Sequence, residues 1–204
     1  MRKFILILGL IMLIVGAIIL SYSFEQIRRL DALIKTDEWF VTHYSLKDEY
    51  GTFGEVTASS TFPAKFKHQL SPAVWGGFKA SLTVELLQEA TVIFRIDSNG
   101  GIIFSVDGSA IISMWYISRI YDHKEQVQLA PGVHKLELYW YGYGGEITFD
   151  MYVEGRDAAA NLQWTGLGVF FIGVAITSVG FVLKRKTSVK IKTDSKLTGN
   201  SNFN

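Results

Sequence analysis

Two uncharged apolar runs, one near each end of the chain, constrain its fold more than any other feature. The first covers residues 4–20, and four further residues bring it to a length that spans the core of a bilayer. The second covers residues 162–183 and has Trp164 near its start, where interfacial aromatic residues are common. The sequence therefore predicts two transmembrane helices, over residues 1–23 and 162–183.

The first run has a second interpretation, as a signal peptide that is removed after export. The small-residue pattern Ser21-Tyr22-Ser23 fits a cleavage site. However, the run is longer than a usual signal core, and no Ala-x-Ala site follows it. We expect the segment to be retained, as a transmembrane helix or an uncleaved signal anchor.

Basic side chains flank both runs on the sides that face the chain termini. Arg2 and Lys3 precede the first run, and Lys184-Arg185-Lys186 follows the second. The cytoplasmic ends of membrane helices carry an excess of Lys and Arg. We therefore expect a two-pass protein of the cell membrane, with both termini cytoplasmic and the middle of the chain extracytoplasmic. The basic cytoplasmic tail, residues 184–204, is predicted to be disordered, with its lysines near anionic lipid headgroups.

Each run also carries small residues seven positions apart. Seven residues make about two helical turns, so each set lies along one face of its helix. Faces of small residues let membrane helices approach closely, because packing drives their association. We expect the two helices to pack on each other, or on a partner, through these glycines. They are Gly9 and Gly16 in the first run, and Gly166, Gly173 and Gly180 in the second.

The segment between the runs is acidic and changes its pattern along the way. Residues 24–161 hold 12 basic and 18 acidic side chains, a net charge of −6, which argues against nucleic acid as a partner. Apolar residues at helical spacing predict a helical stalk over 24–35. Beyond it, aromatic and β-branched residues alternate with polar ones between Gly, Pro, Asn and Asp turns. The sequence therefore predicts an extracytoplasmic domain of strands over 36–155, with a hinge at 156–161.

The predicted strands are short and separated by recognisable turns. Asp107-Gly108 and Ala130-Pro131-Gly132 match turn signals, and a glycine-rich loop at 141–145 closes the last hairpin. Many short strands with turns this regular indicate an antiparallel sandwich or barrel. The predicted strands are 39–46, 81–87, 91–96, 102–106, 110–115, 126–129, 134–141 and 146–153.

Residues 74–155 resemble a PA14 domain in the order and spacing of their motifs. The motifs are VWGGF, ATVIFRIDSNGGIIFSVDG, IISMW and LAPGVHKLELYWYGYGGEITFDMYVEG, and they begin at positions 74, 90, 111 and 129. This resemblance implies a mainly β fold, an antiparallel β-sandwich of the kind found in adhesins, glycosidases and toxins. It also implies that carbohydrate is a common ligand of the domain.

In the sugar-binding PA14 domains, the resemblance further implies, an acidic pair holds calcium, which in turn holds the sugar. Counted back from Asp107, that pair falls on Asn99 and Gly100. Calcium takes about six to eight oxygen ligands, several of them charged, whereas Asn99 offers one neutral carbonyl. Asp97 lies two residues too early. We therefore disfavour calcium, expect no other metal or cofactor, and interpret residues 98–101 as a tight turn.

Aromatic rings near glycines are the more promising surface feature, because exposed rings stack on sugars or anchor protein interfaces. They would act together with polar groups of the loops at 97–101, 107–109, 116–124 and 141–145. The candidate ligand-binding residues are Asp97, Asn99, Asp107, Tyr121, Tyr141 and Tyr143.

The chain lacks the signatures of catalysis that a sequence displays most clearly. No nucleophile-elbow, phosphate-loop or dinucleotide motif is present, and the absence of cysteine excludes disulfides and thiolate metal sites. We predict that the protein is not an enzyme. It is expected to be a membrane-anchored recognition module that binds carbohydrate or another cell-surface polymer. The alternative is a structural or accessory subunit of a membrane complex, with the sandwich contacting a partner protein.

Overall fold

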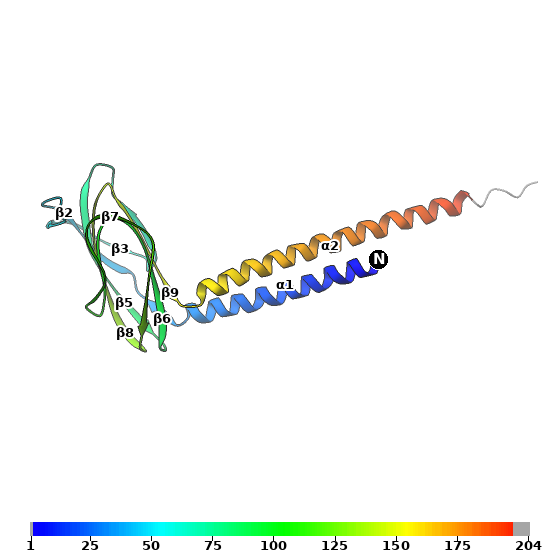
Figure 1. Ribbon diagram of the computed structural model, residues 1–204, viewed down its shortest axis with the longest axis horizontal. Coiled ribbons are helices and arrows are strands. Elements are labelled where there is room, and N and C mark those ends of the chain that lie inside the picture. The colour runs from blue at the N-terminus through cyan, green and yellow to red at the C-terminus, as the bar shows by residue number, and fades with distance from the viewer. Residues whose placement is uncertain (1, 198–204) are drawn as a thin grey trace, which may run out of the picture. The chain divides into compact units, whose positions relative to one another are not determined.

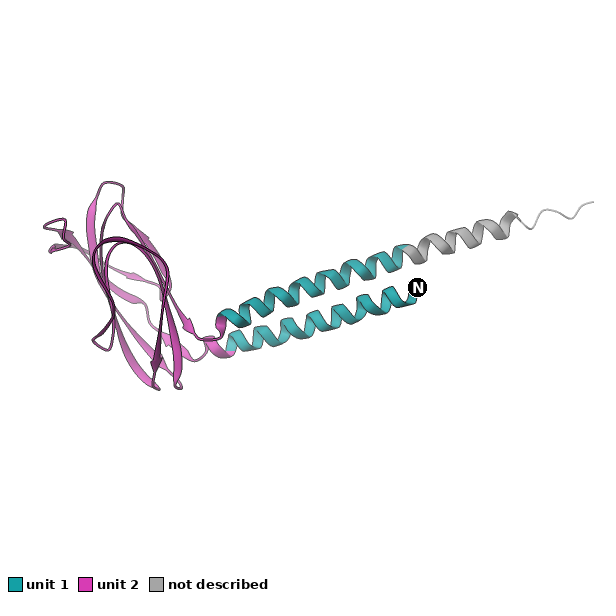
Figure 2. Cartoon of the chain, in the orientation of Figure 1, with its two compact units in different colours: residues 1–28, 157–204 teal, residues 29–156 magenta. Residues whose placement is uncertain are grey.

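The computed structural model describes the backbone of residues 2–197 and the side chains of residues 3–182 (Figure 1). The chain divides into two compact units (Figure 2). One unit consists of two segments, up to residue 28 and from residue 157 onward, and it contains most of the two helices. The other unit, residues 29–156, contains the strands. The basic tail predicted at 184–204 lies outside the described side chains, and residues 198–204 lie outside the described backbone.

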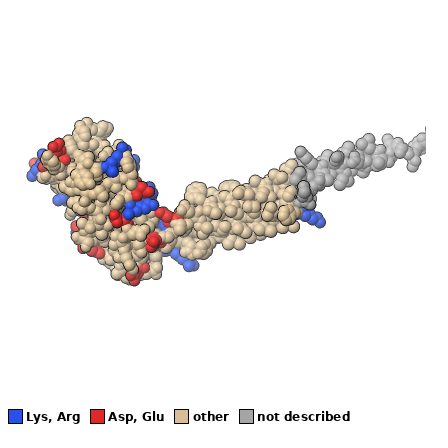
Figure 3. Space-filling view, in the orientation of Figure 1, with Lys and Arg blue, Asp and Glu red and all other residues tan. Residues whose placement is uncertain are grey.

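Two long apolar helices, counted over the described residues, flank the strands in sequence. They are α1 (Arg2–Asp31) and α2 (Arg156–Leu197). By length and composition, the segments Lys3–Asp31 and Arg156–Val182 are each sufficient to cross a membrane. Figure 3 shows the helix pair almost free of charge between its ends, whereas Lys, Arg, Asp and Glu gather on the strand unit.

Both helices end at positions other than those predicted. The first was expected to continue as a stalk to residue 35, but α1 ends at Asp31 because Ile34 already pairs with Leu86 in the sheet. The tail was expected to be disordered from residue 184, but the backbone of α2 is helical to Leu197. Extending an existing helix through Lys and Arg, which are good helix formers, is favourable.

The strand unit is mainly β and antiparallel, as the sequence predicted. Its nine strands, counted over the described residues, are β1 (Ile34–Thr36), β2 (Trp39–Leu46), β3 (Phe53–Phe62), β4 (Phe66–Gln69), β5 (Trp75–Leu86), β6 (Ala90–Val106), β7 (Ser109–Leu129), β8 (Gly132–Tyr143) and β9 (Glu146–Val153).

Strand β6 belongs to two layers of the sandwich. Its second half, residues 101–106, pairs with β8, whereas its first half, residues 92–98, pairs with β9. The larger layer therefore contains β3, β2, β5 and β8, and the smaller layer contains β9 and β4. Strand β7 follows β6 along both halves as its hairpin partner.

The core lies between the two layers and is rich in aromatic rings. Trp39 of the larger layer meets Phe66 and Phe149 of the smaller layer edge to face, with ring centroids 6.1 and 5.0 Å apart. The Trp39 indole is fully buried, and its Nε1 donates a hydrogen bond to the carbonyl oxygen of Ala64 at 3.3 Å. Edge-to-face pairs of this kind add to the free energy of burial.

Two segments predicted as loops are parts of long strands. The predicted turn at 98–101 lies inside β6, and the predicted loop at 116–124 lies inside β7. The glycines serve close packing here instead of chain reversal. A Cβ at Gly100 would lie 3.0 Å from Nε1 of Trp140 and closer still to the carbonyl oxygen of Tyr141.

Candidate functional site

A pocket of about 270 Å³ lies where β6, β7 and β9 meet, on the outer face of the smaller layer. We call it the Asp97 pocket. Its lining residues are Asp97, Ser98 and Asn99 of β6, Arg119, Ile120, Tyr121 and Asp122 of β7, and Glu146 and Thr148 of β9.

Strand register brings these three segments together. Asn99 lies opposite Arg119 in the β6–β7 pair, and β9 begins on the other side of β6. The β6–β7 register shifts between Ile96 and Ser98, a bulge that redirects the intervening side chain. As a result, the Asp97 carboxylate accepts a hydrogen bond from the backbone N–H of Asp122.

Most charges around the pocket are neutralised by neighbours on adjacent strands. Arg95 binds Asp122 at 2.7 Å, and Lys67 of β4 binds Glu146 at 2.8 Å. The hydrogen bond and charge of Lys67 hold the pKa of Glu146 below its ordinary value. Because these pairs are partly exposed, they contribute little to stability.

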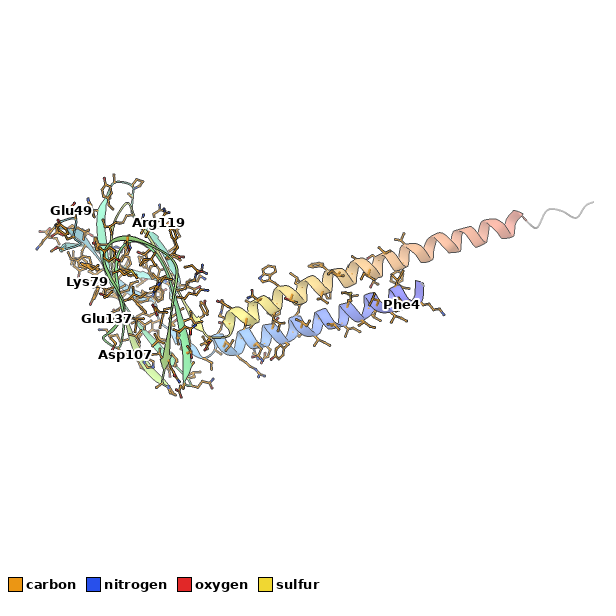
Figure 4. The ribbon with its side chains drawn as sticks, in the orientation of Figure 1. Phe4, Glu49, Lys79, Asp107, Arg119 and Glu137 are labelled. Atoms are coloured by element: carbon orange, nitrogen blue, oxygen red, sulfur yellow. The ribbon has the colours of Figure 1, made fainter. Side chains whose placement is uncertain are left out.

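Arg119 and Tyr121 form the aromatic wall of the pocket. The Arg119 Cζ lies 4.6 Å from the centroid of the Tyr121 ring, which is a cation–π contact. The tyrosine is 63% exposed, so much of its ring reaches solvent. Figure 4 labels Arg119 on the strand unit. An exposed ring beside hydrogen-bonding groups is a suitable surface for a ligand with both apolar and polar faces.

The structure separates the predicted ligand-binding residues. Asp97, Asn99 and Tyr121 meet in the Asp97 pocket. Tyr141 is only 1% exposed, because its ring is covered by Trp115 at 4.8 Å, so a ligand at the surface does not reach it. Tyr143 is exposed, but it packs against Trp75 with ring centroids 5.0 Å apart and does not line the pocket.

Asp107, labelled on the strand unit in Figure 4, lies at a second pocket of about 380 Å³ on the larger layer. Its contacts are those of a turn. Its carboxylate accepts hydrogen bonds from Nδ1 of His134 at 2.7 Å and from the backbone N–H of Lys135 at 2.8 Å. The Nε2 of His134 donates to the carbonyl oxygen of Ala130. Asp107 thereby raises the pKa of His134, while the His134 hydrogen bond lowers the pKa of Asp107.

The donor set of the Asp97 pocket does not resemble a metal centre. Among the described residues, no group of three or more His, Asp or Glu side chains is arranged to hold a metal ion. Asp122 and Glu146 are engaged by cations, and Asp97 accepts a backbone hydrogen bond. These carboxylates are suited to accepting hydrogen bonds from ligand hydroxyls.

Sequence reasoning missed Arg119 and Glu146. Both occupy alternating polar positions of strands, which is also the pattern of an ordinary solvated face. The sequence feature that could have pointed to this site was the spacing of Asp97 and Asn99. Residues two positions apart lie on one face of a strand. Pairing across the hairpin then places Arg119 on that face, but the register had to be known first.

Known proteins resemble this chain only in structure. No family profile matches the sequence, and no curated protein is similar to it. The PA14 domain of the MpAFP antifreeze protein is 10% identical with a TM-score of 0.44, over 59% of this chain and 85% of that one. The PA14 sugar-binding domain from an RTX adhesin is 15% identical with a TM-score of 0.41, over 58% and 90%.

Part of a larger enzyme is similar to this chain to about the same extent. The β-glucosidase from Kluyveromyces marxianus is 10% identical with a TM-score of 0.43, over 59% of this chain, and the matched part is 17% of the enzyme. The present chain therefore spans a small fraction of that protein. Similarities this low do not assign the chain to a family or to a ligand, and the functional argument rests on the pocket.

Proposed function

We propose that this protein is a membrane-anchored recognition module whose Asp97 pocket binds a polyhydroxylated ligand, such as the carbohydrate of a cell-surface polymer. The observation that carries the proposal is the composition of the pocket. The exposed Tyr121 ring lies in one pocket with the Asn99 amide, the Asp97 carboxylate and the Thr148 hydroxyl.

This combination suits a sugar ring. A sugar has an apolar C–H face that packs on an aromatic ring, and hydroxyls that exchange hydrogen bonds with carboxylates and amides. The pocket volume of about 270 Å³ lies just below the range of about 300–1,000 Å³ that is common for small-molecule sites. We expect it to take one sugar-sized unit of a longer molecule.

The proposed role is binding without catalysis. A glycoside hydrolase needs two carboxylates across a cleft, one as acid and one as nucleophile or base. In this pocket Glu146 is paired with Lys67, which lowers its pKa and favours its charged form, and Asp122 is bound by Arg95.

The apolar helices supply the proposed anchor. With α1 and α2 in the bilayer and their basic ends in the cytoplasm, the acidic strand unit lies outside the cytoplasm. Strand β9 runs from Glu146 at the pocket to Val153, shortly before α2 begins. Its seven steps of about 3.4 Å put Glu146 about 24 Å along the strand from Val153.

A glycan array with the full-length protein in lipid nanodiscs tests the proposal, in calcium and again in chelator. We expect binding in both conditions and its loss in the variant Tyr121→Ala. The matched control is Tyr116→Ala, because Tyr116 is an exposed tyrosine of the same strand that does not line the pocket.

Two results would contradict the proposal in different ways. Binding that disappears on chelation would mean that a metal ion completes the site. No binding in either condition would instead favour the alternative, an accessory subunit of a membrane complex, and crosslinking in native membranes would then identify its partner.

A further inference from the structure

Arg119 differs from the other cations around the Asp97 pocket. Arg95 and Lys67 each bind a carboxylate within hydrogen-bonding distance. Among the described side chains, no ion pair joins Arg119 to a carboxylate. Its guanidinium lies over the Tyr121 ring, and its charge helps Lys67 to lower the pKa of Glu146 without a direct hydrogen bond to that carboxylate. Within the described residues, the hydrogen-bond donors of Arg119 therefore have no carboxylate partner.

The surroundings of Arg119 keep it in this state. Glu146 lines the same pocket, but its carboxylate is bound by Lys67. Asn99, directly opposite Arg119 in the β6–β7 register, is uncharged. The Asp97 carboxylate accepts a hydrogen bond from the backbone N–H of Asp122. Each carboxylate near Arg119 thus has another partner.

The Tyr121 ring restricts the conformation of the Arg119 guanidinium before a ligand binds. Stacking on an aromatic face restricts a flexible Arg side chain and leaves the edge of its planar fork available for hydrogen bonds. A planar carboxylate matches that fork with two parallel hydrogen bonds. Because part of the ordering is already complete, less conformational entropy is lost when such a group binds.

The net charge of the pocket region permits an anion to enter. Three cations, Arg95, Lys67 and Arg119, face three carboxylates, Asp97, Asp122 and Glu146, so no excess of negative charge repels it. The charge is distributed unevenly. Among the described side chains, the cation without an ion pair, Arg119, is on β7, and the carboxylate without one, Asp97, is on β6. This asymmetry would orient a ligand that carries one acidic group and several hydroxyls.

We propose that the Asp97 pocket selects acidic saccharides, with Arg119 binding a ligand carboxylate while Asp97 and Asn99 take hydroxyls. The inference rests on the proposed function and names its ligand class: a sugar of the uronic acid type. Neutral sugars retain the Tyr121 stacking but lose the charge-assisted pair.

Two probes that differ only in their carboxylate charges test this selectivity. A trimer of galacturonic acid carries three carboxylates, whereas its fully methyl-esterified form has the same rings and is uncharged. We expect the full-length protein in nanodiscs to bind the acid about tenfold to a hundredfold more tightly, as a charge-assisted pair predicts. The preference should shrink as salt is raised, because ions screen an exposed pair.

Three variants assign the preference to one residue. Arg119→Gln should make the two probes bind equally, and Arg119→Lys, which keeps the charge without the fork, should retain part of the preference. The control Lys79→Gln removes the same charge from the larger layer, where Lys79 lies over the Tyr44 ring at 5.3 Å, and should leave the preference intact.

The outcomes separate the two proposals. Equal binding of acid and ester by the unmodified protein, or a preference that survives Arg119→Gln, would overturn the acidic selectivity and leave the saccharide site standing. If the protein bound neither probe and no other neutral or acidic glycan, both proposals would fall together.

Discussion

A single leucine at Gly173 tests how the two apolar helices meet. A Cβ at this position would lie 2.7 Å from the backbone nitrogen of Leu13 and 3.0 Å from the carbonyl oxygen of Gly9. Backbone atoms cannot rotate aside as a side chain can, so α1 and α2 must separate to admit the new group. The same holds at Gly16, where a Cβ would lie 2.6 Å from the nitrogen of Phe170.

The size of the effect follows from these distances. Ordinary contact for a Cβ begins at 3.4 Å, so the first carbon alone requires a shift of at least 0.7 Å at Gly173, and the rest of the leucine requires more. Overpacking of this kind costs about 1–3 kcal/mol. The equilibrium between packed and separated helices should therefore shift by a factor of roughly 5–150.

Cysteine crosslinking measures this shift, because the chain contains no cysteine of its own. A Cβ at Gly180 would lie 2.9 Å from Cγ of Leu6, so the pair Leu6→Cys and Gly180→Cys reports on helix contact. We expect Gly173→Leu to slow disulfide formation in this pair. The matched control is Gly168→Leu on the same helix, since nothing lies within 4 Å of a Cβ there. Equal crosslinking of the two leucine variants would refute packing through the glycines.

The strand unit gives three further predictions, each measured by denaturant unfolding followed by tryptophan fluorescence. Trp39→Ala should lower the free energy of unfolding by about 3–5 kcal/mol, because it empties the centre of the core. Burial lowers the pKa of His43 and His68. The unfolded chain therefore binds more protons below pH about 6.5, stability should fall as the pH drops through that value, and His68→Phe should reduce the fall. The pKa of His134 is raised by Asp107, so its stabilisation is present below pH about 6.5 and lost as the pH rises through the folded-state pKa. Asp107→Asn should accordingly destabilise more at pH about 6 than at pH about 9, and a pH-independent effect would contradict this reasoning.

Strands with a strongly alternating pattern were predictable from the sequence. β2 and β9 have the predicted bounds, 39–46 and 146–153. In β9 every second residue from Ile147 to Val153 is apolar, and in β2 the buried Trp39 and Val41 begin the same pattern. Strand β3 was missed, since its middle residues, 55–59, are exposed and need no apolar alternation. Backbone pairing with β2 holds this edge strand in place, and such pairing has little signature in a sequence.

Other features of the strand unit and of its site could not be predicted from the sequence, because they depend on pairing between segments that are distant in the chain. The Ser98-Asn99-Gly100-Gly101 stretch has the composition of a turn, but pairing on both edges of β6 keeps it extended. Asp97, Asn99 and Tyr121 were predicted from their chemistry, and the structure places them at one pocket. Arg119 has no distinctive neighbours in sequence, because its role comes from the strand register that sets it opposite Asn99.

The order in which the strands pair has a consequence for synthesis. In the part of the chain that the structure describes, β4 pairs with β9 alone, and β9 is the last strand to be made. From Gln69 to Glu146 is 77 residues, so β4 has no sheet partner while most of the unit is being translated. The smaller layer, which carries the pocket, closes only when β9 has been made. Because α2 begins just three residues after Val153, completion of the sheet and synthesis of the second apolar helix become consecutive steps.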